Sequence, residues 1–163
     1  MNNGLYKQYK DRLPQKLLGS SCNHYANGLI RLCNPDEYSD VLADGYSEET
    51  AIIFATTAFG DFIVWEKGKY VDLVSFSQHK ATVLESGFEF FFEDIKDEKF
   101  LKKYFQYDLF LTAIQKVGEC KDDECFTSNP IPYISGDATV EKLKIGKLRE
   151  YNAVSIDLAG KLL

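Results

Sequence analysis

AIIFATTAFGDFIVWEKGKYVDLVSF, residues 51–76, carries the strongest structural signal in the sequence. It contains three runs rich in apolar and β-branched residues, and these runs are Ala51–Thr57, Phe62–Trp65 and Tyr70–Phe76. Such runs are typical of β-strands, and breaks as short as those between them join neighbouring antiparallel strands. We therefore predict a central antiparallel β-meander at residues 51–76, which Lys80–Glu85 would extend to residue 85 as a fourth strand.

Downstream of the meander, apolar residues recur at the spacing of amphipathic helices. Phe88, Phe91, Phe92 and Ile95 form one such stripe, and Tyr107–Val117 forms a stronger one. Because large aromatic side chains are usually buried, the whole cluster from residue 88 to residue 92, with the phenylalanine at position 90, is expected in the core.

The C-terminal third is predicted to contain a polar loop, an extended segment, a strand and a closing helix. In chain order these are Cys120–Cys125, Pro130–Tyr133, Leu143–Leu148 and Arg149–Ala159. The alanine and isoleucine spacing of the helix predicts that it buries Ala153, Ile156 and Ala159.

Upstream of the meander, the pattern also predicts helices around a short strand. Pro14–Tyr25 is predicted as a helix and Leu29–Leu32 as a strand. Asn34 and Pro35 are a typical N-cap and first helical residue, and the helix that they begin would run to Ala43.

The order of helices, strands and helices predicts an α+β fold. The chain has 163 residues, close to the size of one domain, and 45% of them are hydrophobic, which is enough for a core. We expect buried side chains on the meander and on the helices that follow it. They are Phe54, Phe62, Val64, Leu73, Phe91, Phe110 and Ile114.

The negative charge of the chain is concentrated in two segments. The net charge is −6, and the segment 32–66 holds eight acidic residues and no lysine or arginine. A second acidic segment, Lys121–Glu124, lies in the predicted polar loop. Nucleic-acid-binding proteins usually carry a basic surface, so we expect no nucleic-acid partner.

These acidic segments have two interpretations. They are either a solvated surface that keeps the protein soluble, or a contact surface for a basic partner. The candidate partner-binding residues are Asp36, Glu37, Asp40, Asp44, Glu48, Glu49, Asp61, Asp122, Asp123 and Glu124.

No catalytic or metal-binding pattern occurs in the sequence. The only histidines are His24 and His79, and His24 stands two residues from Cys22, a spacing that points side chains apart on a helix. Cys120 and Cys125 do not have the spacing of a zinc finger. We therefore expect no catalytic residue, no metal, no cofactor and four free thiols.

We also find no secretory signal and no membrane-spanning segment in the sequence. Residues 1–12, MNNGLYKQYKDR, lack the apolar stretch of a secretory signal, and no window is long and apolar enough to span a membrane. These observations favour a cytoplasmic protein that makes no membrane contact.

Three segments together resemble a known family. The segments are GLIRLCNPDEY (residues 28–38), ATTAFGDFIVWEKGKYVDLVSFSQH (residues 55–79) and VGECKDDECFTSNPIPYISGDATVEKLKIGKLREYNAVSIDLAG (residues 117–160). They are similar to the Asn-Pro helix start of GAD-like domains, to the T-A-F-G-D core of bacterial type VI secretion immunity proteins, and to the K-L-R-E-Y end of that family. The meander also resembles, more distantly, that of SUKH-superfamily immunity proteins. One departure is Ser135-Gly136-Asp137, where the family commonly has a double-glycine turn.

The resemblance implies a non-catalytic immunity protein that neutralises a cognate toxin in the cytoplasm. One branch of the family is associated with DNase effectors, so a nuclease effector is one expected kind of toxin. The implied organisation is a single immunity-type domain, residues 1–163. Its GAD-like leading part would cover residues 13–50, and the meander with the C-terminal helical part would cover residues 51–163.

Two other functions remain open at this point. One is a SUKH-like intracellular regulatory module that binds a protein unrelated to any toxin. The other is an enzyme with an unrecognised site around Asp61, His79 and Asp72. A deep polar pocket with converging titratable groups would favour the enzyme, and a neighbouring toxin gene would favour the immunity protein.

Overall fold

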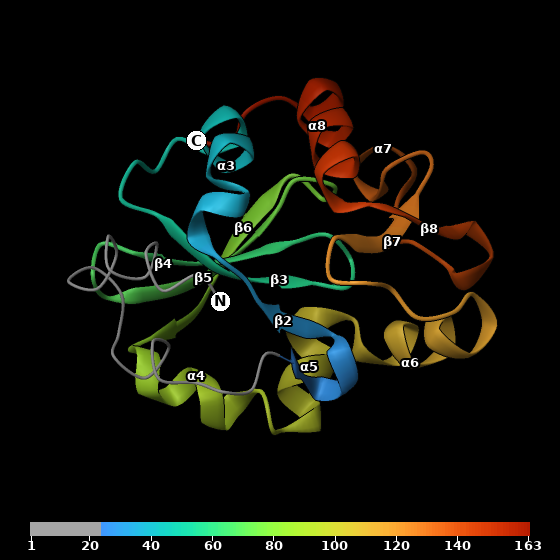
Figure 1. Cartoon of the computed structure of the whole chain (residues 1–163), viewed down its shortest axis with the longest axis horizontal. Coiled ribbons are helices and arrows are strands. Elements are labelled where there is room, and N and C mark those ends of the chain that lie inside the picture. Colours follow the sequence, from blue (N-terminus) through green and yellow to red (C-terminus); the bar gives the residue numbers. More distant parts are fainter. Residues whose placement is uncertain (1–23) are drawn as a thin grey trace.

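The predicted meander forms the last four strands of a six-stranded antiparallel sheet in the computed structural model, which describes residues 24–163 (Figure 1). The strands follow chain order and are β1 (His24–Tyr25), β2 (Ile30–Leu32), β3 (Ile52–Thr57), β4 (Phe62–Glu66), β5 (Tyr70–Ser75) and β6 (Lys80–Ser86). A second antiparallel sheet contains β7 (Glu124–Ser128) and β8 (Leu143–Lys147).

Helices precede and follow the meander, so the α+β class is confirmed. The α-helices are α3 (Ser39–Gly45), α4 (Phe88–Asp94), α5 (Glu98–Phe105), α6 (Tyr107–Lys116), α7 (Pro132–Ser135) and α8 (Leu148–Ala159). The described part of the chain also has three short 3-10 turns, η1 (Ala26–Gly28), η2 (Pro35–Glu37) and η3 (Val140–Lys142). Within residues 24–163, no helix combines the length and the apolar character needed to cross a membrane.

The break between β4 and β5 is the tight turn that the sequence predicts. Lys67 and Gly68 have positive φ values of 56° and 62°, respectively. Two consecutive positive φ values are typical of the type I′ turn, whose twist matches that of a two-stranded hairpin. The turn fixes the register of the hairpin, in which Glu66 pairs with Tyr70 and Phe62 pairs with Val74.

Helices cover both faces of the main sheet (Figure 1). Because strand side chains alternate between faces, Phe54 points to the layer of α4, α5 and α6. Its neighbour Ile53 and the β4 residues Phe62 and Val64 point to the layer of α3 and α8. All six positions of β3 are therefore buried.

The predicted core is largely confirmed. All predicted members except one are buried, and that exception, Ile114, is partly buried against the α4–α6 layer. The prediction for Phe90 is wrong, because this side chain is 54% exposed. Residues 88, 91 and 92 share the inner side of α4, and position 90 falls on the opposite side of the helix.

The closing helix α8 buries a different face from the predicted one. Ala153 is exposed, and Ile156 and Ala159 are only partly buried, whereas the polar residues Asn152 and Ser155 are buried. Asn152 Nδ2 donates to the carbonyl oxygen of Gly60 at 2.8 Å, and Ser155 Oγ donates to the carbonyl of Tyr151 at 2.7 Å. Because these groups are hydrogen-bonded, the cost of burying them is offset.

Four local predictions also differ from the structure. The predicted polar loop ends early, because β7 starts at Glu124 and pairs with β8. Pro132–Ser135 forms a short helix where an extended segment was predicted. His24–Tyr25, the end of the predicted helix Pro14–Tyr25, is a strand, and the rest of that prediction lies outside the described residues. The Asn34 side chain accepts from the Asp36 amide as predicted, but it caps η2, and α3 begins later.

A glycine allows α3 to lie close to α8 and to Phe76, the residue that follows β5. A Cβ atom on Gly45 would lie 2.5 Å from Phe76 Cε1 and 2.6 Å from Ile156 Cδ1. Such distances are far inside van der Waals contact, so any side chain would push α3 outward. The position of α3, which carries part of the acidic segment, therefore depends on this glycine.

Candidate partner-binding surface

The candidate acids lie on the surface, with one exception that is described below. Asp36 and Glu37 are in η2, Asp40 and Asp44 are on α3, Glu48 and Glu49 follow α3, and Asp122, Asp123 and Glu124 precede or begin β7. All nine are exposed or partly exposed.

The two acidic segments meet around Glu37. This residue lines one hollow of about 260 Å³ with Asp122, and a second hollow of about 260 Å³ with Asp123. Asp40 lies on the same side, because it forms an ion pair with Arg149, which also lines the second hollow. We call Glu37, Asp40, Asp122 and Asp123 the acidic face.

Two cationic side chains of the same chain already pair with residues of the acidic face. Arg149 donates to Asp40 at 2.7 Å and to the carbonyl oxygen of Glu37, and Lys147 donates to Asp123 at 2.8 Å. These hydrogen bonds hold the pKa values of Asp40 and Asp123 below their usual range. Exposed ion pairs of this kind contribute little to stability, so a partner's cations can replace them at small cost.

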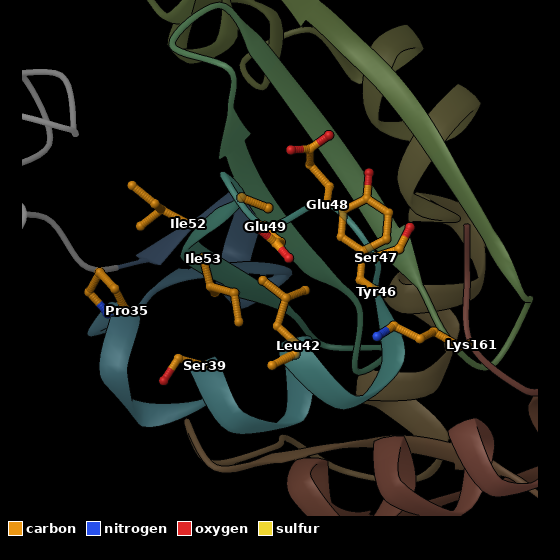
Figure 2. A pocket seen from close by; sticks show the side chains of 12 residues that line it. Pro35, Ser39, Leu42, Tyr46, Ser47, Glu48, Glu49, Ile52, Ile53 and Lys161 are labelled. Carbon is orange, nitrogen blue, oxygen red and sulfur yellow. The ribbon is translucent and has the colours of Figure 1, made fainter.

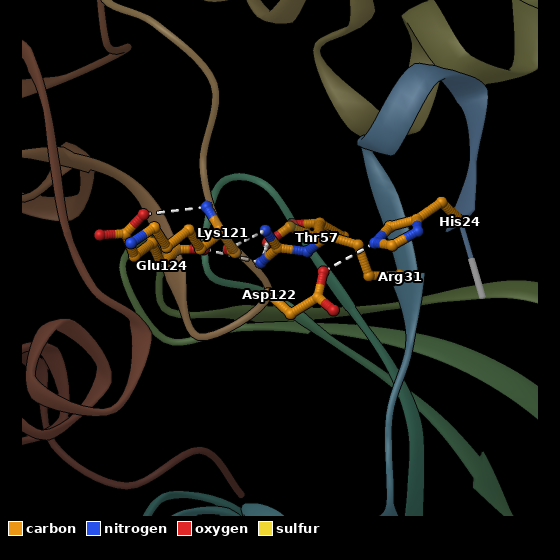
Figure 3. A network of polar contacts seen from close by, with 6 residues as sticks. All are labelled: His24, Arg31, Thr57, Lys121, Asp122 and Glu124. Atoms are coloured by element: carbon orange, nitrogen blue, oxygen red, sulfur yellow. Dashed lines mark hydrogen bonds and ion pairs between the residues drawn. The ribbon is translucent and has the colours of Figure 1, made fainter. Parts of the chain in front are cut away.

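A buried arginine holds the second acidic segment against the sheet (Figure 3). Arg31, on β2, is 3% exposed and donates to the carbonyl oxygens of Lys121 at 3.0 Å, Thr57 at 3.1 Å and Glu124 at 2.8 Å. The loop also bonds to itself, because the Lys121 amide donates to Glu124 Oε1 at 2.9 Å. Arg31 therefore determines where the carboxylates of this loop stand.

Asp122 is tied to the first strand of the sheet. Its Oδ1 lies 2.7 Å from His24 Nε2, on β1 (Figure 3). Neither contact of this loop, with Arg31 or with His24, is predicted by the local sequence pattern. The available signal was an arginine inside the apolar run LIRLC, residues 29–33, where a buried cation needs several acceptors.

A groove lies beside the acidic segment that follows α3 (Figure 2). Its volume is about 610 Å³. One wall comes from α3, with Ser39, Leu42 and Ala43, and the other comes from Ala51–Ile53. Glu48, Glu49, Tyr46 and Lys161 are its polar or charged lining groups, together with two serines.

Asp61 is the exception among the candidate acids, because it is only 5% exposed and is not available to a partner. Its amide donates to Thr57 Oγ1 at 3.2 Å, and its carboxyl bonds to the hydroxyls of Thr57 and Ser75. Burial raises the pKa of Asp61 to about 7, although these hydroxyls and Lys80 act in the opposite direction. Asp61 therefore belongs to the corner between β3 and β4.

Two of the suggested enzyme residues, Asp61 and Asp72, lie apart on the sheet. Phe62 pairs with Val74, so Asp61 lies three positions along the ladder from Asp72, which pairs with Val64. That separation is roughly 10 Å at the rise of a strand. Asp72 instead bonds to Glu66, and burial raises its pKa to about 7. His79 packs on Tyr133, with 4.8 Å between the ring centroids.

The thiols are not activated for chemistry. Cys33, Cys120 and Cys125 form no disulfide, and Cys22 lies outside the described residues. Burial raises the pKa of Cys120 to about 11 and that of Cys125 further, which disfavours the reactive thiolate. Among residues 24–163, no group of histidine, cysteine and carboxylate side chains could hold a metal ion.

Asp61 also sets an expected pH dependence of stability. The folded state binds more protons than the unfolded state between the ordinary aspartate pKa, about 4, and the folded value, about 7. The free energy of unfolding should therefore fall as pH rises across this range. Asp61→Asn removes this titration, so we expect its loss of stability from about pH 4 to pH 7 to be smaller by roughly 2–4 kcal/mol.

Urea denaturation at both pH values measures this difference. Asp157→Asn changes an exposed acid on α8 and is the matched control, which should follow the wild type. Asp72 titrates in the same range, so some pH dependence remains in the variant. Equal slopes for Asp61→Asn and the wild type would contradict the prediction.

Comparisons with known proteins found matches to two regions of the chain. Residues 1–77 match the family model of the GAD-like domain, and residues 85–159 match that of the T6SS immunity protein Tdi1, C-terminal. No curated protein matches the chain. The crystal structure of Atu4351 from Agrobacterium tumefaciens is similar, with a TM-score of 0.73 and 19% identity, over 95% of this chain and 80% of that chain. That similarity shows a shared fold. The chain therefore joins a region that matches the GAD-like domain to a region that matches the C-terminal domain of the T6SS immunity protein Tdi1.

Proposed function

We propose that the protein binds and neutralises a cognate type VI secretion toxin in the cytoplasm of the cell that makes it. The match of residues 85–159 to an immunity domain carries this proposal. The protein would act by binding alone, a proposal supported by the separation of Asp61 from Asp72 and by thiols that are not activated. The toxin would be covered or blocked at its active site, without being modified.

The acidic face is the proposed contact for a basic toxin surface. A nuclease holds phosphate groups with lysine and arginine, so carboxylates in the same positions would compete with the nucleic acid. Charged groups at the rim of an interface mainly raise the rate of association and make that rate depend on salt. The acidic face would therefore steer the toxin before closer contacts form.

The candidate acids differ in whether their carboxylates are already paired with a cation of the same chain. Asp40, Asp123 and Glu48 already form ion pairs with Arg149, Lys147 and Lys67. Glu37, Asp44 and Glu49 form no ion pair with another residue of the described part of the chain. A basic partner would meet these three first and would then exchange with the chain's own cations.

Neutralising the acidic face should slow association with the toxin. In the variant with Glu37→Gln, Asp40→Asn, Asp122→Asn and Asp123→Asn, we expect the association rate at low salt to fall about tenfold or more, and its salt dependence to flatten. The dissociation rate should change much less. Binding kinetics with the toxin encoded by the adjacent gene, measured at several salt concentrations, test this expectation.

A control variant with the same change of net charge separates the effect of charge position from the effect of total charge. It carries Glu89→Gln, Asp137→Asn, Glu141→Gln and Asp157→Asn, all at exposed positions away from the acidic face. Equal association rates for the two variants would remove the acidic face from the mechanism. If the wild type neither binds the toxin nor protects cells that express it, the proposed function fails and a SUKH-like regulatory module becomes the better interpretation.

A further inference from the structure

We propose that the groove beside α3 receives a lysine or arginine side chain of the toxin, so that it is a specific anchor point within a broader interface. This inference rests on the proposed function and names a second contact, separate from the acidic face. Its basis is the shape of the groove, the charges at its rim and a buried carboxylate behind it.

The shape of the groove fits a long side chain with an apolar stem. Its volume is about 610 Å³, and small residues keep it open, namely Ser39, Ala43, Ser47 and Ala51. Leu42, Ile52 and Ile53 also line it, and each exposes no more than 6% of its surface there (Figure 2). Lysine and arginine pack their methylene stems against such surface while the charged end reaches polar groups.

Carboxylates stand where that charged end would arrive. Glu48 and Glu49 line the groove, and Figure 2 shows Glu48 beside Tyr46. Glu48 Oε1 accepts from the amide and hydroxyl of Thr50, which fixes its direction, and its Oε2 lies 3.5 Å from Lys67 Nζ. The rim is therefore acidic and ordered.

Tyr46 connects the groove to a buried carboxyl pair. Its hydroxyl donates to Glu66 Oε1 at 2.8 Å, and Glu66 in turn bonds to Asp72. Both acids are about 95% buried, and Asp72 Oδ1 has no hydrogen-bond partner among the described residues. A buried acceptor without a donor is uncommon and unfavourable. The field of this pair, added to that of Glu48, favours a cation at the Tyr46 end of the groove.

Lys161 provides a test of the charge of the incoming side chain, because it is a cation that already lines the groove. It forms no ion pair with another residue in the part of the chain that the structure describes. An incoming lysine or arginine would be repelled by it. Removing the charge of Lys161 should therefore strengthen binding of a basic anchor, whereas removing the charges of Glu48 and Glu49 should weaken it.

The experiment compares equilibrium dissociation constants of full-length variants for the toxin encoded by the adjacent gene. Glu48→Gln with Glu49→Gln should weaken binding about tenfold, and Lys161→Gln should strengthen it about threefold. Glutamine at position 48 keeps an oxygen for Thr50. Ala43→Trp, at an exposed position on α3, fills the groove and should weaken binding about 100-fold. Asp157→Asn is the control outside the groove and should leave binding unchanged, and thermal melting checks that each variant is folded.

The outcomes separate this inference from the proposed function. If the wild type binds the toxin and both Ala43→Trp and the double glutamine variant bind equally well, the groove is not an anchor site and the immunity function stands. If Lys161→Gln weakens binding, the groove receives an acidic side chain and the proposed occupant is wrong. If the wild type does not bind, the proposed function itself fails.

Discussion

Replacing Phe110 by alanine is expected to lower the free energy of unfolding by about 3–5 kcal/mol. Phe110, on α6, is 2% exposed and its ring centroid lies 6.4 Å from that of Phe126 on β7. The ring also stacks with Tyr107, with 6.3 Å between centroids. It therefore joins α6 to the small second sheet. Truncation removes these contacts and leaves a cavity that the surrounding rings cannot fill without moving.

Ile114→Ala is the matched control for this measurement. Ile114 lies one turn further along α6 but is only partly buried, so its truncation should cost less, about 1–2 kcal/mol. Urea denaturation followed by circular dichroism gives both values. An unchanged midpoint for Phe110→Ala, or a larger loss for Ile114→Ala, would show that this part of the core is placed wrongly.

Arg31→Met is expected to lower the free energy of unfolding by about 3 kcal/mol. The methionine keeps much of the side-chain volume but donates no hydrogen bond. Three carbonyl oxygens, of Thr57, Lys121 and Glu124, would lose their arginine donor. The loop that carries Asp122 and Asp123 would lose its attachment to the sheet, so toxin association should also slow.

Arg31→Lys tests whether the fork of the guanidinium is needed. A lysine keeps the charge, but its single ammonium cannot reach all three carbonyls in the same geometry, so stability should be intermediate. Hydrogen exchange of the amides of residues 121–124 reports the loop directly, and exchange should be faster in both variants. Wild-type exchange and wild-type stability in Arg31→Met would contradict the assigned role.

The two matched regions are joined in one structure. The GAD-like match ends at residue 77, just after β5, and the immunity-domain match begins at residue 85, within β6. Because β5 and β6 are paired over their length, the main sheet continues from one region into the other. The acidic face also draws on both, with Glu37 and Asp40 from the first and Asp122 and Asp123 from the second.

The meander was predictable because its signal is local. Alternating β-branched and apolar residues and the Lys67-Gly68 turn specify strands and their register over a few residues. The same holds for α4 and α6, whose apolar spacing repeats several times. Residue type alone was not enough to predict burial at Phe90, because a surface helix exposes one side to solvent even where a phenylalanine lies on that side.

The buried face of α8 was not predictable in the same way. Asn152 and Ser155 look like solvent-facing residues, and only the nearby carbonyls of Gly60 and Tyr151 make their burial favourable. A hydrogen bond between residues 92 positions apart has no counterpart in the local pattern. Asp61 was placed on the surface for the same reason, because its partners Thr57 and Ser75 belong to other strands.

The order and spacing of nearby residues were enough to predict the strands of the meander, the helices after it, the α+β fold and the family resemblance. Which carboxylates share a surface depends on tertiary contacts between distant segments. Glu37 and Asp122 meet because antiparallel pairing, the close approach at Gly45 and the hydrogen bonds of Arg31 bring distant segments together. Such contacts join segments that are far apart in the sequence, so the local pattern does not reveal them. The same kind of contact buries Asp61, whereas the other nine candidate acids stay at the surface.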